Sequence, residues 1–263
     1  MKKLGTLFGV GVGPGDPELL TFKAARVLRE ADVVFTSAQE RSGRSLALEI
    51  AAPHLPPGTE VVPLPFCHTY EAVENGEAHR ENARRVLDTL ARPASAAFLT
   101  LGDPMTYSTF TYLLAALRAL EPSVPVEVVP GVTSYSAAAA AAQVPLAEGD
   151  ESLAVVSASK GVGRLGAALD QCENVVVMKS YRRTAEVCDL LEARELRGRT
   201  LFAADCSRPE GLCLRDLEAV RRLPRRYMSL FLVKGGGRPA AELSDGPAAD
   251  PPEQSLPAPQ RRG

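Results

Sequence analysis

The sequence predicts an α/β fold in two parts. Apolar runs of strand length alternate with segments of helical periodicity along most of the chain, which is the pattern of strands and helices packed in layers. Proline and glycine gather between Val144 and Gly149 and look like a hinge between a longer first half and a second half of shorter units. We expect an N-terminal α/β domain over residues 1–133 and a C-terminal α/β domain over residues 134–237.

A glycine-rich turn follows the first strand. Residues 6–12 form a short apolar run, which Gly13-Pro14-Gly15 interrupts. Asp16 can cap a helix and Pro17 can begin one, because proline has no N–H to leave unpaired, and apolar residues recur at helical spacing from Leu19 to Leu28. No Gly-x-Gly-x-x-Gly can be laid on these glycines, which argues against a dinucleotide-binding turn. A plain strand-to-helix junction remains the alternative to a ligand-binding turn.

The rest of the first half continues the alternation. Strands are predicted over residues 32–37, 60–63, 96–101 and 126–129, and helices over 46–52, 83–90, 110–120 and 136–142. The polar segment over 66–80 is either a solvated connection or a mobile flap over a site.

The second half is predicted to continue the alternation of strands and helices, in shorter elements. Strands are expected over residues 153–157, 175–178, 200–204 and 229–233, with helices over 165–169, 185–191 and 214–223. After residue 237 the periodicity is lost, and residues 238–263 contain six prolines and few large apolar residues. That composition predicts a disordered tail.

Composition excludes several classes of protein. A hydrophobic content of 45%, 24% charged residues and a net charge of −2 are ordinary for a soluble globular protein and give no sign of a nucleic-acid or membrane-surface binder. No apolar run approaches the roughly 20 residues of a membrane span, and no signal peptide is evident, so a cytoplasmic protein is expected. Five scattered cysteines and three dispersed histidines predict reduced thiols and no metal site.

Three predicted strands end in polar or glycine turns. These are Gly13-Pro14-Gly15-Asp16, Gly102-Asp103-Pro104 and Pro130-Gly131-Val132-Thr133-Ser134. In an open parallel sheet the carboxyl ends of the strands form the edge where ligands bind. The three turns are therefore expected to share one binding edge.

Together and in this order the three turns resemble those of the tetrapyrrole methylases, S-adenosylmethionine-dependent enzymes of corrin and sirohaem synthesis. The stretches 101–109 and 130–137 are similar to the precorrin-2 or cobalt-factor II C20-methyltransferases of cobalamin synthesis. The resemblance covers about residues 4 to 235. It implies a mostly parallel N-terminal sheet, a mixed C-terminal sheet, a cofactor cleft between them, a tetrapyrrole substrate and, usually, a homodimer.

The resemblance also implies cofactor-binding residues. By motif these are Pro14, Gly102, Asp103, Met105, Thr106, Thr133, Ser134, Met178, Ala204, Asp205 and Cys206. Asp103 can equally form an Asx turn before Pro104, and the two roles can coexist; Met178 at a strand end is also a common core residue. The sirohaem-forming relatives carry Tyr-Asp where this chain has Thr36-Ser37, so their catalytic carboxylate cannot be placed here.

Methyl transfer from a sulfonium to an electron-rich macrocycle carbon depends mainly on positioning. Tyr107 is the candidate catalytic residue that shapes the site or assists removal of the proton, with a packing tyrosine as the alternative. A substrate rich in carboxylates needs arginines gathered locally, because the net charge is negative. Solvated surface charges are the alternative for each candidate: Arg41, Arg44, Arg80, Arg182 and Arg183.

Other functions remain open. The same fold can carry a methylase for a different corrin position or an RNA ribose methylase, although no stripe rich in Lys and Arg supports RNA binding. A third hypothesis is a non-catalytic or nucleotide-binding α/β protein, and the glycine turns at three strand ends argue against it.

Overall fold

The structure is a computed structural model that describes residues 4–38, 45–66, 76–92 and 94–235. The predicted tail over residues 238–263 lies outside the described residues, as do Arg41, Arg44 and most of the polar segment that the sequence suggests as a flap.

The described residues of the first half build a parallel sheet in the order β3-β2-β4-β1-β5. All four neighbouring pairs run parallel. The central strands are continuous apolar runs because helices cover both faces of the sheet. The strands are β1 (Leu7–Gly11), β2 (Val33–Ala38), β3 (Glu60–Pro65), β4 (Ala96–Thr100) and β5 (Val126–Val129).

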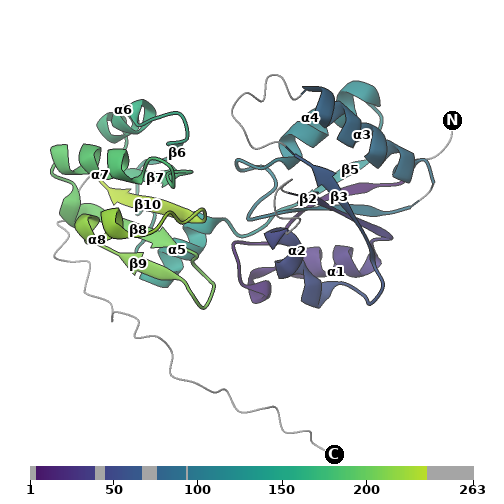
Figure 1. Ribbon diagram of the computed structural model, residues 1–263, viewed down its shortest axis with the longest axis horizontal. Helices are drawn as coiled ribbons and strands as arrows, with labels where there is room; N and C mark the ends of the chain where they lie inside the picture. The colour runs from purple at the N-terminus through teal and green to yellow at the C-terminus, as the bar shows by residue number, and fades with distance from the viewer. Residues whose placement is uncertain (1–3, 39–44, 67–75, 93, 236–263) are drawn as a thin grey trace, which may run out of the picture.

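Two pairs of helices cover this sheet (Figure 1). The helices α1 (Phe22–Glu30) and α2 (Leu46–Ala51) pack on one face, and α3 (Gly76–Leu90) and α4 (Phe110–Leu120) pack on the other. The fit is tight beneath α4, because a Cβ at Gly9 would lie 2.3 Å from the Phe110 ring. Glycine in β1 is therefore required by packing. A short 3-10 turn, η2 (Ala52–His54), extends α2.

The first helix begins later than predicted. The structure separates a 3-10 turn, η1 (Pro17–Leu19), from α1. Asp16 caps η1 by accepting from the Glu18 N–H, and Thr21, in extended conformation, caps α1 by accepting from the Ala24 N–H. Two capping residues in close succession make two short helical elements where apolar spacing alone predicts one.

The second half contains a mixed sheet in the order β6-β7-β10-β8-β9. Strands β6 and β7 are parallel, whereas β10 runs antiparallel to β7 and β8, and β9 runs antiparallel to β8. The predicted fold class, two α/β sheets of which the first is parallel and the second mixed, is confirmed. The strands are β6 (Leu153–Ser157), β7 (Asn174–Met178), β8 (Thr200–Ala204), β9 (Leu212–Leu214) and β10 (Ser229–Lys234).

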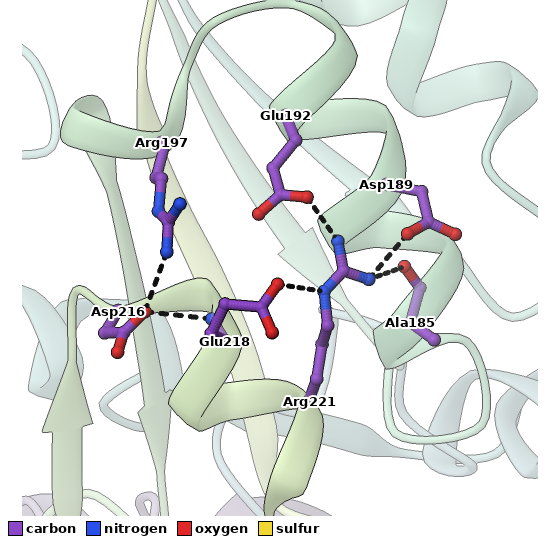
Figure 2. A network of polar contacts seen from close by, with 7 residues as sticks. All are labelled: Ala185, Asp189, Glu192, Arg197, Asp216, Glu218 and Arg221. Carbon is purple, nitrogen blue, oxygen red and sulfur yellow. Dashed lines mark hydrogen bonds and ion pairs between the residues drawn. The ribbon is translucent and has the colours of Figure 1, made fainter.

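Helices cover both faces of the mixed sheet as well. The helices α6 (Gly163–Gln171), α7 (Thr184–Ala193) and α8 (Leu217–Arg222) pack on one face, and η3 (Arg197–Arg199) precedes β8. Figure 2 shows Arg221 of α8 bonded to Asp189 and Glu192 of α7, a polar network that ties the two helices together. None of the described helices combines the length and apolar character that crossing a bilayer requires.

The alanine-rich helix α5 (Ser134–Ala142) packs on the other face of the second sheet, through Ala138 and Ala139. The segment 144–149, expected as the hinge between the halves, therefore joins α5 to β6 within the second half. Because α5 lies on the second sheet, we propose that the domain boundary falls at residues 133–134.

One predicted helix is partly a strand. The helix expected over residues 214–223 is split into β9, paired with β8, and α8, which Asp216 caps by accepting from the Glu218 N–H at 2.9 Å. The cap stops the helix from extending back to residue 214.

Candidate functional site

The turns after β1, β4 and β5 meet at one edge of the first sheet. Gly13 and Gly102 exchange backbone hydrogen bonds of 3.3 and 2.7 Å. The Asp103 carboxylate then reaches the turn after β5, where its Oδ2 accepts from the Gly131 N–H at 3.1 Å. The strand order puts the three turns together, as the sequence predicts.

Close backbone packing explains two of the glycines in these turns. A Cβ on Gly11 would lie 2.6 Å from the carbonyl oxygen of Gly102, and one on Gly131 would lie 2.1 Å from the same oxygen. Gly102 differs, because its φ of +68° favours glycine while a Cβ there would meet only the Val132 oxygen, at 3.8 Å. The space that a side chain at Gly102 would occupy is therefore nearly empty, although the residue itself is buried.

The Asp103 side chain holds the turn in shape. Its Oδ1 accepts from the Met105 N–H at 2.9 Å and from the Thr106 hydroxyl at 3.3 Å, which is an Asx turn. With the bond to Gly131, the carboxylate joins the turns after β4 and β5. The structural role that the sequence suggests for Asp103 is present.

Tyr107 connects the first half to the second. Its hydroxyl donates to the Val155 carbonyl oxygen at 3.1 Å, and the Lys179 ammonium lies 5.5 Å from the centre of its ring. Tyr107 is 44% exposed and Met105 in the same turn is 56% exposed. Both apolar surfaces thus remain accessible beside the polar groups of the turn.

The second half contributes the ends of β7 and β8. Met178 ends β7 and packs, partly buried, against the core cluster that includes Val176 and Leu230. Beyond β8, the Asp205 carboxylate pairs with Arg226 at 2.7 Å, and Ala204 and Cys206 on either side of it are buried. Asp205 has a partner of its own, so any contact with a ligand must leave that ion pair in place or exchange it.

A second contact between the halves involves Ser207. Its hydroxyl accepts from the Asp16 N–H at 3.2 Å, and a Cβ on Gly15 would lie 2.6 Å from Cγ of Arg208. A cavity of about 480 Å³ opens here, between residues 15–17, residues 46, 49 and 50 of α2, and residues 207–209.

Sequence reasoning missed this cavity wall. A signal was available, because Ser207 and Arg208 lie in the loop that begins after the predicted strand over residues 200–204.

Thr133 and Ser134 begin α5. Thr133 is the cap, and its Oγ1 accepts from the Ser136 N–H at 3.3 Å. The buried Pro14 lies in the turn that pairs with Gly102. All the predicted cofactor residues therefore stand at the ends of β1, β4, β5, β7 and β8.

The predicted arginines are not gathered into one cluster by any contact of the described residues. Arg80 is exposed on α3, Arg183 pairs with Glu186 at 2.7 Å, and Arg182 lies 5.4 Å from the Tyr181 ring centre. Arg41 and Arg44 lie outside the described residues. In the part of the chain that the structure describes, no group of His, Cys, Asp and Glu is arranged to hold a metal ion.

Fold and site together define a class of protein: a two-sheet α/β protein in which strand-end turns of a parallel sheet face the strand ends of a mixed sheet. Accessible apolar surface and hydroxyl groups lie side by side there, which suits an amphipathic small molecule.

The chain belongs to the Tetrapyrrole (Corrin/Porphyrin) Methylases, whose family model matches residues 6–219. It is 36% identical over 232 residues to a cobalt-precorrin-2 C(20)-methyltransferase of Salmonella typhimurium, a match that covers 87% of this chain and 96% of that one. It is 35% identical over 199 residues to a precorrin-2 C(20)-methyltransferase of Sinorhizobium sp, covering 72% and 79%.

A solved structure agrees with this assignment. The uroporphyrin-III C-methyl transferase of Thermus thermophilus complexed with S-adenyl homocysteine is 30% identical, with a TM-score of 0.63, and the match covers 87% of this chain and 92% of that one.

Proposed function

We propose that this chain is an S-adenosylmethionine-dependent C-methyltransferase that methylates C20 of precorrin-2, or of its cobalt-loaded form, in cobalamin biosynthesis. The observation that carries the proposal is the similarity to C20-methyltransferases, one of which matches 87% of this chain and 96% of its own length. A soluble homodimer in the cytoplasm is part of the same proposal, on the strength of the family.

The residues at the strand ends suit the cofactor. The exposed faces of Met105 and Tyr107 offer apolar contact, while the hydroxyls of Thr106 and Thr133 offer polar contact. Pro14, Ser134, Met178 and residues 204–206 complete the proposed set. Bound S-adenosylmethionine supplies a methyl group already activated on a sulfonium, and S-adenosylhomocysteine is the product.

The work left to the protein is positioning. Holding two reactants in line can supply on the order of 7 to 11 kcal/mol of the barrier. The Asp103 hydrogen bonds fix the turns after β4 and β5 relative to each other, and Tyr107 fixes the first half against β6. We assign Tyr107 to shaping the site, since its hydroxyl already donates to Val155 and must leave that bond to act on a proton.

Product analysis tests the function directly. The purified chain is incubated with S-adenosylmethionine carrying a labelled methyl group and with either metal-free precorrin-2 or its cobalt form, and the methylated carbon is located by NMR. A label at C20 supports the proposal, and the preferred form identifies the substrate. A label at another carbon, or none, contradicts it.

Asp103→Ala tests the proposed cofactor site. We expect the variant to bind S-adenosylhomocysteine much more weakly in calorimetry, because two turns lose their shared anchor. Asp32→Ala is the matched control, since Asp32 also accepts a backbone N–H, from Ser95 at 2.8 Å, but precedes β2 at the opposite end of the sheet. Equal affinity in the Asp103 variant and the wild type would contradict the placement.

A further inference from the structure

Lys179 has a strained backbone that no helix end explains. Six described residues other than glycine have positive φ, and two of them, Gln143 and Glu195, follow helices α5 and α7, where this conformation is common. The other four come after β4, β7 and β8: Tyr107, Lys179, Asp205 and Ser207. Backbone strain of this kind concentrates at functional sites.

The strain at residue 179 directs an ammonium group toward the first half. Strand pairing persists to Met178, whose carbonyl oxygen accepts from the Ala158 N–H at 2.9 Å, and the chain then turns with a φ of 55° at Lys179. The ammonium lies 5.5 Å from the centre of the Tyr107 ring, itself at a φ of 51°. Two strained residues from opposite halves therefore meet in a cation–π contact.

Lys179 has no carboxylate partner among the described residues, whereas three arginines of the second half do. Arg183, Arg208 and Arg226 each form an ion pair. Lys179 is exposed overall, but neighbouring groups displace part of the water around its ammonium, and this desolvation lowers the pKa of the ammonium. A partly desolvated charge without a counter-charge favours binding of an anion.

The neighbouring cation in the same turn is arranged in the same way. Arg182 lies 5.4 Å from the Tyr181 ring centre and, within the described residues, pairs with no carboxylate. A tyrosine face holds a cation in place without neutralising it. In the described part of the chain, the turn after β7 thus carries two cations without a carboxylate partner, and one of them, Lys179, contacts the first half.

We propose that Lys179, held over Tyr107, binds a carboxylate of a ligand in the cleft between the two halves. The proposal rests on the proposed function, which supplies two sources of that chemistry: an acidic side chain of the macrocycle, and the methionyl carboxylate of S-adenosylmethionine. The Tyr107 ring fixes the ammonium, and Arg182 adds to the positive potential.

Four proteins test the proposal: wild type, Lys179→Gln, Lys179→Arg and Lys160→Gln. Lys160 is the control because it is an exposed lysine after the neighbouring strand β6, so a general electrostatic attraction would affect both positions alike. The measurements are the KM for the macrocycle at saturating S-adenosylmethionine, and calorimetric Kd values for S-adenosylhomocysteine and for methylthioadenosine, which lacks the amino-acid carboxylate.

Two results support the proposal and identify the source. If a macrocycle carboxylate binds, Lys179→Gln raises the KM about tenfold or more, as loss of a charge-assisted hydrogen bond implies, and leaves both Kd values unchanged. If the methionyl carboxylate binds, the variant raises the Kd for S-adenosylhomocysteine by a similar factor and leaves the Kd for methylthioadenosine unchanged. Lys179→Arg recovers most of either loss.

A Lys179→Gln variant with unchanged KM and unchanged Kd values, beside an active wild type, would overturn the proposal. The proposal would also be overturned if Lys160→Gln changed the KM or the Kd values as much as Lys179→Gln does. Failure of the wild type to bind S-adenosylhomocysteine or to transfer methyl would instead count against the proposed function.

Discussion

Cys206 and Cys213 are two thiols that a single contact makes chemically different. A hydrogen bond between them lowers the pKa of Cys213 to about 7 and raises the pKa of Cys206. Cys213 is exposed on β9, whereas Cys206 is buried after β8. Cys188 lies in the core, and burial raises the pKa of its thiol to about 11.

We predict that Cys213 is alkylated first among the described thiols of the native protein. Thiolate is the reactive form, so its rate with iodoacetamide should rise as pH passes about 7 and level off above, while Cys188 reacts only on unfolding. Peptide mass spectrometry over a time course from pH 6 to 9 measures this.

The control for this prediction is Cys206→Ala, which removes the hydrogen-bond donor. The rate at Cys213 near pH 7 should fall in this variant, because less thiolate is present. An unchanged rate would show that the contact does not set the reactivity.

At the residue scale the sequence predicted side chains whose role is local. The Asx turn at Asp103 follows from the residue and the proline after it. The role proposed for Lys179 was not predicted from the sequence, because it depends on a tyrosine 72 positions away in the chain and on a backbone angle that no sequence pattern indicates.

At the scale of elements, Arg221 joins α8 to α7. Its guanidinium bonds to Asp189 at 2.5 Å, to Glu192 at 2.6 Å and to Glu218 at 3.3 Å, and also donates to the Ala185 carbonyl oxygen (Figure 2). The side chain is largely shielded from solvent, which makes such a network worth more than an isolated surface pair. Three acidic groups would face one another without it.

We expect Arg221→Ala to destabilise the second half by about 1–2 kcal/mol, or roughly 3–7 °C in unfolding temperature. Thermal unfolding followed by circular dichroism measures the change. Arg197→Ala is the control, because Arg197 pairs with Asp216 in the same network but is exposed. If the two variants lose the same stability, the shielding of Arg221 has no energetic importance.

Elements with a strong period were predicted well, and their ends less so. The strands β1, β4, β7 and β8 are apolar runs that only buried strands explain. The strand β9 has three residues, too few for a period, and it forms because β8 offers an open edge. Thr21 divides the first helix because its side chain accepts the Ala24 N–H, and this hydrogen bond replaces one that a continuous helix would make.

At the scale of the molecule, the two halves touch through loops. Tyr107 reaches Val155, and Ser207 accepts from the Asp16 N–H. The sequence predicts two halves, since each has its own run of strands and helices. It cannot predict which loops meet, because those contacts depend on how the sheets are oriented.

Gly15→Ala should loosen the second of these contacts. The added methyl would lie 2.6 Å from Cγ of Arg208 and 3.1 Å from the Ser207 hydroxyl, so both side chains must shift and the hydrogen bond from the Asp16 N–H to Ser207 is weakened. We expect faster hydrogen exchange in peptides that cover Asp16 and the loop over residues 205–211, measured by mass spectrometry. The control is Gly163→Ala, where nothing lies within 4 Å of the added methyl. Unchanged exchange in the Gly15 variant would mean that the contact is not maintained in solution.

The order of the first sheet has a consequence for synthesis on the ribosome. Strand β1 pairs with β4 and β5, Leu7 lying opposite Ala96 and Val126, so the first strand to emerge waits for neighbours that are made about 90 residues later. At typical translation speeds this delay lasts roughly 5 to 20 seconds, during which an apolar strand is exposed to other nascent chains. Gly9 and Gly11, which the finished packing requires, also weaken the tendency of that strand to aggregate while it waits.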